Sequence, residues 1–409
     1  MAKEYKDLVV GLDIGTSKIM VVVAEITADG KLKLAGLGVA PSNGLKRGVV
    51  VNIDATVQSI QQALKEAELM ADCRIARVST GITGSHIRGI NSSGMVAIKD
   101  REVTPADVAR VIETAKAINI STDQRLLLVE PQEFVIDGQD VKEPIGMSGI
   151  RLEAKVHIVT GAQSAAENII KCVRRCGLEV DQLMLNPLAS SQAILTEDER
   201  ELGVALVDIG AGTTDVAIFA GGAIRHTAVI PIAGDLITSD IAMALRTPTK
   251  DAEDIKVESG CAKQLLADPQ DQVEVPGLGD RGPRMIGKQA LAGVIEPRVE
   301  EIFALVQQVI RDSGYEEVLS SGIVITGGSA VMPGMVELGE DIFLKPVRRG
   351  VPKYASHLSD MVAQPRASTV MGLLEEARMG RMRGHKVAQK AGSVQSAFGR
   401  VKDWFVGNF

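Results

Sequence analysis

Two glycine-rich segments carry residues whose types and spacing suggest chemistry. Gly203 to Phe219 reads GVALVDIGAGTTDVAIF, so an apolar run leads into Asp208, a turn follows, and a second apolar run closes the segment. This pattern predicts a strand, a tight turn and a strand. Glycine lets a ligand approach the main chain closely, and successive N–H groups in such a turn bind anions. The candidate ligand-binding residues are Asp208, Gly210, Ala211, Gly212, Thr213 and Thr214.

Asp208 gives this turn a further requirement. A carboxylate at the mouth of a phosphate-binding turn repels the phosphate unless a divalent cation lies between them. The segment therefore predicts a combined phosphate and metal site. An ordinary hairpin is the alternative, since glycine between apolar runs is also a common hairpin signal.

The same pattern occurs near the N-terminus, where residues 9–25 read VVGLDIGTSKIMVVVAE. Aligning Asp13 with Asp208 pairs Thr16-Ser17 with Thr213-Thr214 after a two-residue difference. About 195 residues separate the two aspartates, which predicts two domain-sized halves facing one cleft. Mg²⁺ is expected at both aspartates through water. The residues predicted to bind here are Asp13, Gly15, Thr16, Ser17 and Lys18, with the lysine suited to a β- or γ-phosphate.

A third segment, residues 322–334, reads GIVITGGSAVMPG and places Gly327, Gly328 and Ser329 where backbone can pass under a flat nucleoside. Two such hairpins and this turn, in this order, resemble the actin/Hsp70/sugar-kinase nucleotide-binding superfamily. With DIGTSK, AELMADC, DIGAGTTD, VIEPR and ITGGSA at these separations, the chain resembles the FtsA family of bacterial cell-division proteins from Leu8 to its last residue.

This resemblance implies an α/β, actin-like two-domain ATP-binding fold with a duplicated ribonuclease-H-like core, a small α/β insert and a C-terminal amphipathic helix. The first lobe is expected over 1–83, 161–200 and 360–378. The second lobe is expected over 201–246 and 302–359, with an outer subdomain at 247–301. A short strand, a helix opened by Thr104-Pro105 and further strands over 125–136 and 151–159 mark residues 84–160 as the insert.

The resemblance also implies a function. The protein is expected to bind ATP and Mg²⁺, to polymerise on the inner face of the cell membrane at the division site, and to anchor FtsZ filaments there. Other division proteins are expected to bind residues 84–160, and no nucleic acid is expected. No general base can be assigned, so the sequence leaves open whether the protein is an ATPase. A pilus-assembly or chaperone-like ATPase and a small-molecule kinase are the alternatives.

Composition and charge set the wider limits. The formal net charge is −7, but residues 377–409 carry seven Lys and Arg against one Asp, which leaves −13 for the remainder. An acidic body with a basic tail predicts a tail that binds an anionic surface. The four cysteines form no zinc or redox motif, and no run has the length of a transmembrane span. His86 and His157 stand alone and are interpreted as structural.

Two further groups of charged residues lie in the second half of the chain. Glu253 and Lys256 share a helix face and are assigned near the ribose from the superfamily resemblance, with a solvated surface ion pair as the alternative. The glycine- and proline-rich stretch 264–287 contains fragments of dinucleotide and P-loop motifs, which we reject because the helix and hydroxyl they need are missing. By resemblance, Arg284, Lys288 and Arg298 are expected to contact the acidic C-terminal peptide of FtsZ.

The last sixteen residues, VQSAFGRVKDWFVGNF, predict an amphipathic helix. At 100° per residue, their apolar side chains fall within an arc of about 140°, with basic residues beside it. A basic flexible linker is predicted over 379–393, and the helix is expected to fold in a lipid interface. Docking into a protein groove is the alternative. The predicted membrane contacts are Phe398, Arg400, Val401, Lys402, Trp404, Phe405 and Phe409.

Overall fold

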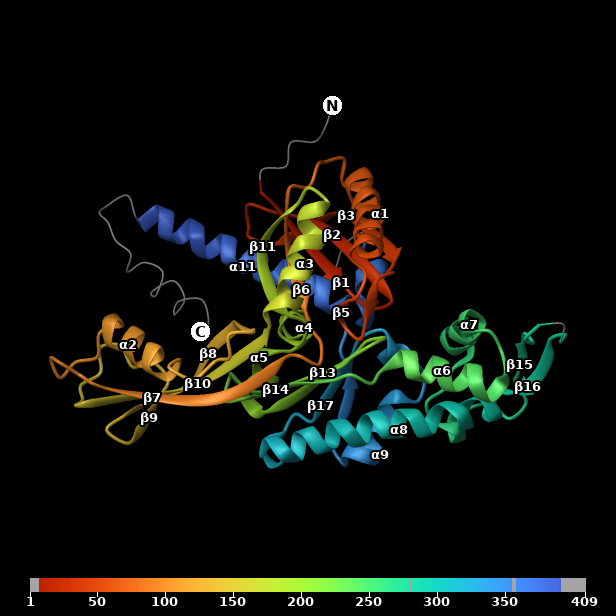
Figure 1. Ribbon diagram of the computed structural model, residues 1–409. Coiled ribbons are helices and arrows are strands. Elements are labelled where there is room, and N and C mark those ends of the chain that lie inside the picture. The colour runs from red at the N-terminus through yellow and green to blue at the C-terminus, as the bar shows by residue number, and fades with distance from the viewer. Residues whose placement is uncertain (1–6, 280, 355–357, 391–409) are drawn as a thin grey trace.

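Two five-stranded sheets form the cores of two lobes (Figure 1). The structure is a computed structural model that describes residues 7–279, 281–354 and 358–390. In the first lobe the strand order is β11-β6-β1-β2-β3, and in the second it is β14-β13-β12-β17-β18. Each sheet has three consecutive antiparallel strands followed by parallel neighbours. This duplication confirms the predicted actin-like fold class.

The strands of both lobes are short and largely buried. In the first lobe they are β1 (Leu8–Ile14), β2 (Lys18–Ile26), β3 (Leu32–Pro41), β6 (Arg77–Ile82) and β11 (Glu179–Leu185), with the small β4 (Leu45–Lys46) and β5 (Val49–Val50) beside them. In the second lobe they are β12 (Val204–Ile209), β13 (Thr214–Ala220), β14 (Ala223–Ile230), β17 (Ile323–Thr326) and β18 (Val347–Arg349).

Helices cover both faces of the first sheet. Because side chains alternate along a strand, Val10 and Leu12 pack in the same cluster as α1 (Ile53–Ala71) and α3 (Gln163–Arg175), while Val9 packs in the cluster that contains α11 (Ser368–Lys390). Helix α4 (Asn186–Ile194) lies against α11 so closely that a Cβ on Gly372 would fall 1.6 Å from the carbonyl oxygen of Ala189. The small residues Ala189-Ser190-Ser191 allow this close packing.

The second lobe contains a long helix of 26 residues. Helix α8 (Lys288–Ser313) starts directly after a hairpin of β15 (Gln272–Val275) and β16 (Arg284–Gly287), within the glycine- and proline-rich stretch. The helix buries Phe303 against Phe343, with ring centroids 5.1 Å apart. The remaining helices of this lobe are α6 (Gly234–Leu245), α7 (Thr249–Ser259) and α9 (Met335–Phe343), and α5 (Glu197–Leu202) and α10 (Ser359–Val362) lie in the connections.

The insert forms its own sheet, with strand order β7-β10-β8-β9, and packs α2 (Pro105–Ala115) on it. Thr104 and Asp107 close the start of α2 in a capping box, as its sequence predicted. The strands are β7 (Arg88–Ala97), β8 (Gln124–Ile136), β9 (Gln139–Val141) and β10 (Arg151–Ala162). The predicted α/β insert is therefore confirmed as part of the fold.

The insert belongs to the first lobe by chain connection but also contacts the edge strand of the second lobe. Gln132 Nε2 donates to the carbonyl oxygen of Ile224 on β14 at 2.8 Å, and Arg225 forms an ion pair of 2.5 Å with Glu133. His157 is 1% exposed, and its Nε2 lies 2.9 Å from Thr227 Oγ1. Burial lowers the pKa of His157 to about 4, which favours the neutral ring, and its buried contacts agree with the structural interpretation.

The predicted flexible linker at 379–393 is wrong for the part that the structure describes, because α11 continues through Lys390. Arg378, the last residue of the expected helix, attaches α11 to the first lobe. Arg378 forms an ion pair of 2.7 Å with Glu375 and donates to the carbonyl oxygen of Gly30 at 3.0 Å. Figure 1 shows α11 extending on the side where the insert lies. The predicted membrane helix at 394–409 lies outside the described residues.

Among the described helices, none is both long enough and apolar enough to cross a membrane. The four cysteines are free thiols, and burial raises the pKa of Cys73, Cys172 and Cys176.

Candidate functional site

The two predicted hairpins have turns of equal length and face one cleft of about 610 Å³ between the lobes. Ile14 pairs with Ile19, and Ile209 pairs with Thr214, so each turn holds four residues. In both turns the first glycine donates its N–H to the carbonyl oxygen of the fourth residue, at 3.0 and 2.9 Å. The two-residue difference in our sequence alignment is therefore wrong. Lys18, not Thr16-Ser17, occupies the place of Thr213.

Asp13 and Lys18 form the charged pair of the first hairpin. Asp13 is 5% exposed, and its Oδ2 accepts a hydrogen bond from Lys18 Nζ at 2.8 Å. The lysine side chain is 22% exposed, so it reaches the cleft from the edge while the carboxylate lies deeper. A buried carboxylate beside a movable ammonium group is suited to binding a phosphate together with a cation.

Asp208 is the matching carboxylate of the second hairpin and lies in the same cleft. Its Oδ2 accepts hydrogen bonds from Ser190 of α4 at 2.5 Å and from Thr369 of α11 at 3.4 Å. Burial, and to a smaller extent the negative charge of Asp13, raises the pKa of Asp208 to about 6 against the opposing effects of Ser190, Lys18 and Thr369.

Asp215 is a third buried carboxylate that our sequence reasoning missed. It pairs directly with Asp208 across β12 and β13, so both side chains lie on one face of the sheet, where like charges are destabilising. Asp215 accepts hydrogen bonds from the hydroxyls of Thr83 and Thr213. Burial, and then the charge of Asp208, raises the pKa of Asp215 to about 8. The final Asp of the quoted motif DIGAGTTD was the available signal.

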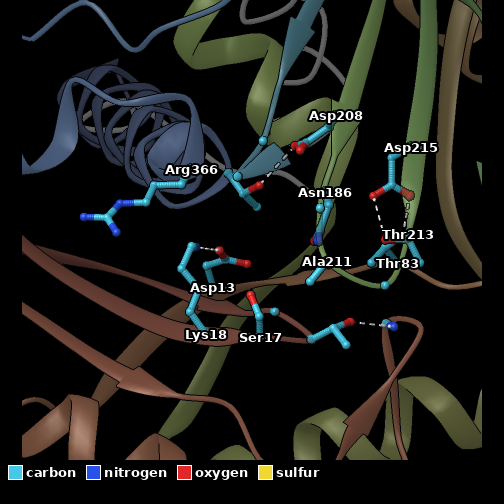
Figure 2. Close-up of a pocket in the computed structure, with 18 of the residues that line it drawn as sticks. Asp13, Ser17, Lys18, Thr83, Asn186, Asp208, Ala211, Thr213, Asp215 and Arg366 are labelled. Atoms are coloured by element: carbon cyan, nitrogen blue, oxygen red, sulfur yellow. Dashed lines mark hydrogen bonds and ion pairs between the residues drawn. The ribbon is translucent and has the colours of Figure 1, made fainter. Parts of the chain in front are cut away.

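Most of the predicted phosphate-binding residues line this cleft. Figure 2 shows Asp13, Asp208 and Asp215 with the side chains around them. The predicted lining residues are Asp13, Gly15, Thr16, Ser17, Lys18, Asp208, Gly210, Ala211, Gly212, Thr213, Gly327 and Gly328. The lining residues that our reasoning did not select are Ile14, Gly48, Thr83, Asn186, Asp215, Pro365, Arg366 and Thr369. Ile14 and Asp215 lie in the strands of the two hairpins, and the other six come from separate turns and helix starts, where the sequence has no local phosphate pattern.

Four predicted residues lie behind the lining rather than in it. Thr214 is fully buried, and its hydroxyl donates to the carbonyl oxygen of Ile232, so it offers no donor to a ligand and our assignment of it was wrong. Ser329 donates to the carbonyl oxygen of Gly210 at 2.9 Å, which ties the nucleoside turn to the phosphate turn.

Glu253 and Lys256 are the other two predicted residues that lie behind the lining, and they form an ion pair. Lys256 is 8% exposed and donates to Glu253 at 2.6 Å and to Thr238 at 2.8 Å. It also donates to the carbonyl oxygen of Gly234 at 3.2 Å. The lysine is therefore not part of a solvated surface ion pair.

The three predicted peptide-binding cations all have partners within the chain. Arg298 forms two bonds to Asp240, at 2.5 and 3.1 Å, and an ion pair with Glu301. Arg284 is exposed and donates to the carbonyl oxygen of Leu245, and Lys288 lies 3.5 Å from Asp271. An acidic peptide would have to compete with these acceptors.

Glycine backbone, hydroxyls and one ammonium group thus surround buried carboxylates in a single cleft. In the part of the chain that the structure describes, no group of three or more His, Cys, Asp or Glu side chains is placed to hold a metal ion. A cation bound at Asp13 and Asp208 would need water or ligand oxygens for the rest of its coordination, as Mg²⁺ commonly has in phosphate sites.

Two family models match the chain. The model described as "Cell division protein FtsA" matches residues 205–372, and the model described as "SHS2 domain inserted in FTSA" matches residues 84–160, which is the range expected for the insert.

Two curated relatives, each named "Cell division protein FtsA", are similar over nearly the whole chain. The protein of Pseudomonas aeruginosa is 56% identical over 409 residues, covering 98% of both chains. The protein of Neisseria meningitidis is 51% identical over 406 residues, covering 97% of this chain and 98% of the relative.

Solved structures with the same fold have low sequence identity. The PilM–PilN type IV pilus biogenesis complex matches with a TM-score of 0.62 and 17% identity, covering 90% of this chain and 98% of the other. MreB5 of Spiroplasma citri bound to ADP matches with a TM-score of 0.57 and 14% identity, covering 96% of this chain and 100% of the other. A double helical filament of MamK matches with a TM-score of 0.52 and 12% identity, covering 90% of this chain and 99% of the other.

The raised pKa of Asp215 predicts a pH dependence of stability in the nucleotide-free, metal-free protein. Its pKa is about 8 in the folded chain and about 4 in the unfolded chain. The folded state holds a proton that the unfolded chain releases, so this group's contribution to the free energy of unfolding falls as the pH rises from about 4 to 8. Asp215→Asn removes the charge, and its melting temperature is expected to exceed that of wild type by more at pH 8 than at pH 5.

Asp72→Asn, at an exposed helix C-cap, is the matched control and is expected to follow wild type at both pH values. An equal difference between Asp215→Asn and wild type at pH 5 and pH 8 would show that Asp215 does not hold this proton.

Proposed function

The chain belongs to the FtsA family of cell division proteins, and on this premise we propose that it binds ATP with Mg²⁺ between its lobes and assembles into filaments. The observation that carries the proposal is the meeting of Asp13, Asp208 and the two glycine turns in one cleft. MreB5, which shares the fold, was solved with ADP, and this supports a nucleotide as the ligand.

The residues fit a nucleotide with its metal ion. Gly15 and Gly210 open the two turns, Lys18 supplies a cation, and Asp13 and Asp208 supply the carboxylates that Mg²⁺ prefers. A Cβ built on Gly328 meets no atom within 4 Å, which leaves space for a nucleoside beside this backbone. When bound, Mg²⁺ would neutralise phosphate charge that the aspartates otherwise repel. Ser329, Glu253 and Lys256 would then stabilise the nucleoside side from behind the lining.

Lys18→Ala tests the phosphate contact. Loss of one charge-assisted hydrogen bond costs about 1.5–3 kcal/mol, so ATP affinity is expected to fall by about 10- to 100-fold. The measurement is a titration with ATP and Mg²⁺ followed by calorimetry. Lys31→Ala, which removes an 82% exposed lysine from a surface ion pair, is the matched control and is expected to bind as wild type. Equal affinity of Lys18→Ala and wild type would exclude a phosphate role for Lys18.

Nucleotide in this cleft would act mainly on assembly. Asp208 is hydrogen-bonded by Ser190 and Thr369, which lie on the two helices that join the lobes, so a ligand at Asp208 acts on both connections. A ligand that binds one arrangement of the lobes more tightly shifts the population toward it without turnover. The MamK filament, which has the same fold, supports an assembly made of copies of this chain.

The membrane contact is proposed for residues 394–409, with anionic phospholipid on the cytoplasmic face at the division site. Each Lys or Arg at the basic end of α11 and in the tail would add about 1 kcal/mol to the free energy of binding such a surface. The apolar arc of the tail would enter the interface beside them.

Co-sedimentation with vesicles tests this anchor. Full-length protein is expected to pellet with phosphatidylglycerol-containing vesicles, and a form ending at residue 390, where α11 ends, is expected to stay in the supernatant. Trp404→Glu in the full chain is expected to weaken pelleting, whereas Leu69→Glu, at an 82% exposed apolar position of the body, is not. The anchor assignment fails if the truncated and full-length proteins pellet equally, with and without ATP.

The outer subdomain of the second lobe is proposed to bind the C-terminal peptide of FtsZ, in keeping with the family. Arg284, Lys288 and Arg298 lie here, and exposed apolar side chains accompany them, at Leu265, Leu266, Leu278 and Met285. Other division proteins are proposed to bind the insert.

Lys288→Glu tests the peptide contact better than a change at Arg298, because Arg298 is bonded to Asp240 and its reversal would disturb the fold. The dissociation constant for a fluorescent FtsZ C-terminal peptide is expected to rise about fivefold, which corresponds to about 1 kcal/mol. Lys250→Glu, at an exposed position of the same subdomain, is the control. An unchanged dissociation constant for Lys288→Glu would remove Lys288 from the peptide site.

A further inference from the structure

Asp215 is bonded by hydroxyl groups from both lobes. Thr213, in the phosphate turn of the second lobe, donates to Asp215 Oδ2 at 3.4 Å. Thr83 directly follows β6 of the first lobe and donates to Asp215 Oδ1 (Figure 2). Thr83 and Asp215 are 7% and 3% exposed, so water has little access to replace either hydroxyl. The carboxyl group of Asp215 thus joins the phosphate turn of one lobe to the other lobe.

Thr83 is also the last residue before the insert, whose two chain connections are bonded to each other. Gly84 has a φ of +137°, a conformation that favours glycine, and a Cβ there would lie 3.0 Å from His86 Nε2. The N–H of Ala162, just after the insert, donates to His86 Nδ1 at 3.2 Å. A change in the position of Thr83 is therefore passed to both ends of the insert.

The hairpin of β13 and β14 that carries Asp215 contacts the insert at a second place. Asp215 pairs with Val229 of β14, and two residues earlier on that strand Thr227 bonds His157 of the insert at 2.9 Å. The contact is close, because a Cβ on Gly89 of β7 would fall 2.5 Å from Thr227 Oγ1. The hairpin is therefore attached to the insert twice, and the first of these attachments lines the cleft.

We propose that the Thr83–Asp215 hydrogen bond couples the cleft to the insert, so that a bound nucleotide with its metal ion orders the insert for its partners. This inference rests on the proposed binding of ATP. A ligand that contacts the phosphate turn fixes Thr213 and Asp215, and Thr83 passes this order to the start of the insert. Coupling between two binding sites is reciprocal, so a partner that orders the insert raises the affinity for ATP by the same factor.

Hydrogen exchange of the full chain with and without Mg²⁺ and ATP tests the coupling. In wild type, saturating ligand is expected to slow exchange at the amides of residues 84–90 by about fivefold or more, in line with typical coupling factors. T83V keeps the shape of the side chain and removes the hydroxyl, so this slowing is expected to disappear although calorimetry shows the cleft saturated. T83S keeps the hydroxyl and is expected to respond as wild type does.

T114V is the matched control and is expected to keep the full response. Thr114 is an exposed residue of α2 in the insert, and its hydroxyl donates to the carbonyl oxygen of Arg110 at 2.9 Å, so this variant also loses one bonded hydroxyl. A purely structural role for Thr83 would lower the melting temperature of T83V and leave its response to ATP intact. If T83V does not fold, T83C repeats the measurements, because a thiol is only a weak donor.

The outcomes separate the two proposals. If wild type does not bind ATP in calorimetry, the proposed function and this inference both fail. If wild type binds ATP but residues 84–90 exchange no more slowly, the inference alone is overturned. An equal response of T83V and T83S at saturation would also overturn it, because the hydroxyl of Thr83 would then not carry the coupling.

Discussion

Repulsion among three buried carboxylates is the constraint on which the rest of the structure depends. Asp13, Asp208 and Asp215 lie in one cleft, and two of them face each other across neighbouring strands. In the protein alone, Lys18 and several hydroxyl groups stabilise these carboxylates. The raised pKa values of Asp208 and Asp215 favour their neutral forms. A divalent cation would compensate this negative charge and would also neutralise part of the charge of a phosphate chain beside it, so the cleft favours a phosphate only together with the cation.

The groups that stabilise these carboxylates come from the elements that join the lobes. Ser190 lies on α4 and Thr369 on α11, and these helices pack backbone to backbone at Ala189 and Gly372. Thr83, which bonds Asp215, is the last residue before the insert. The charge state of the cleft is therefore linked by direct hydrogen bonds to both connections and to the base of the insert.

Much of this arrangement could be predicted from the sequence, and the omissions have physical reasons. Asp13, Asp208 and the glycines lie in short local patterns that fix a strand and a turn. Asp215 was missed because its role depends on hairpin register, which decides that it faces Asp208, and the turns had been aligned with unequal lengths. Thr83 after β6, Asn186 at the start of α4 and Arg366 in a short 3-10 helix come from separate segments that only the tertiary fold brings together. The helical extension of α11 was missed because its contacts are distant in sequence, as where Met382 lies beside Gly30.

The contact between the insert and β14 has a mechanical consequence for the two lobes. One end of the insert continues from β6 of the first lobe, while Gln132, Glu133 and His157 are bonded to the edge strand of the second. Hydrogen bonds weaken steeply beyond about 3.5 Å, so this bridge tolerates only small shear between the lobes before it breaks. The insert therefore restrains the relative motion of the two lobes. A protein that binds the outer end of the insert would change how far the lobes can separate.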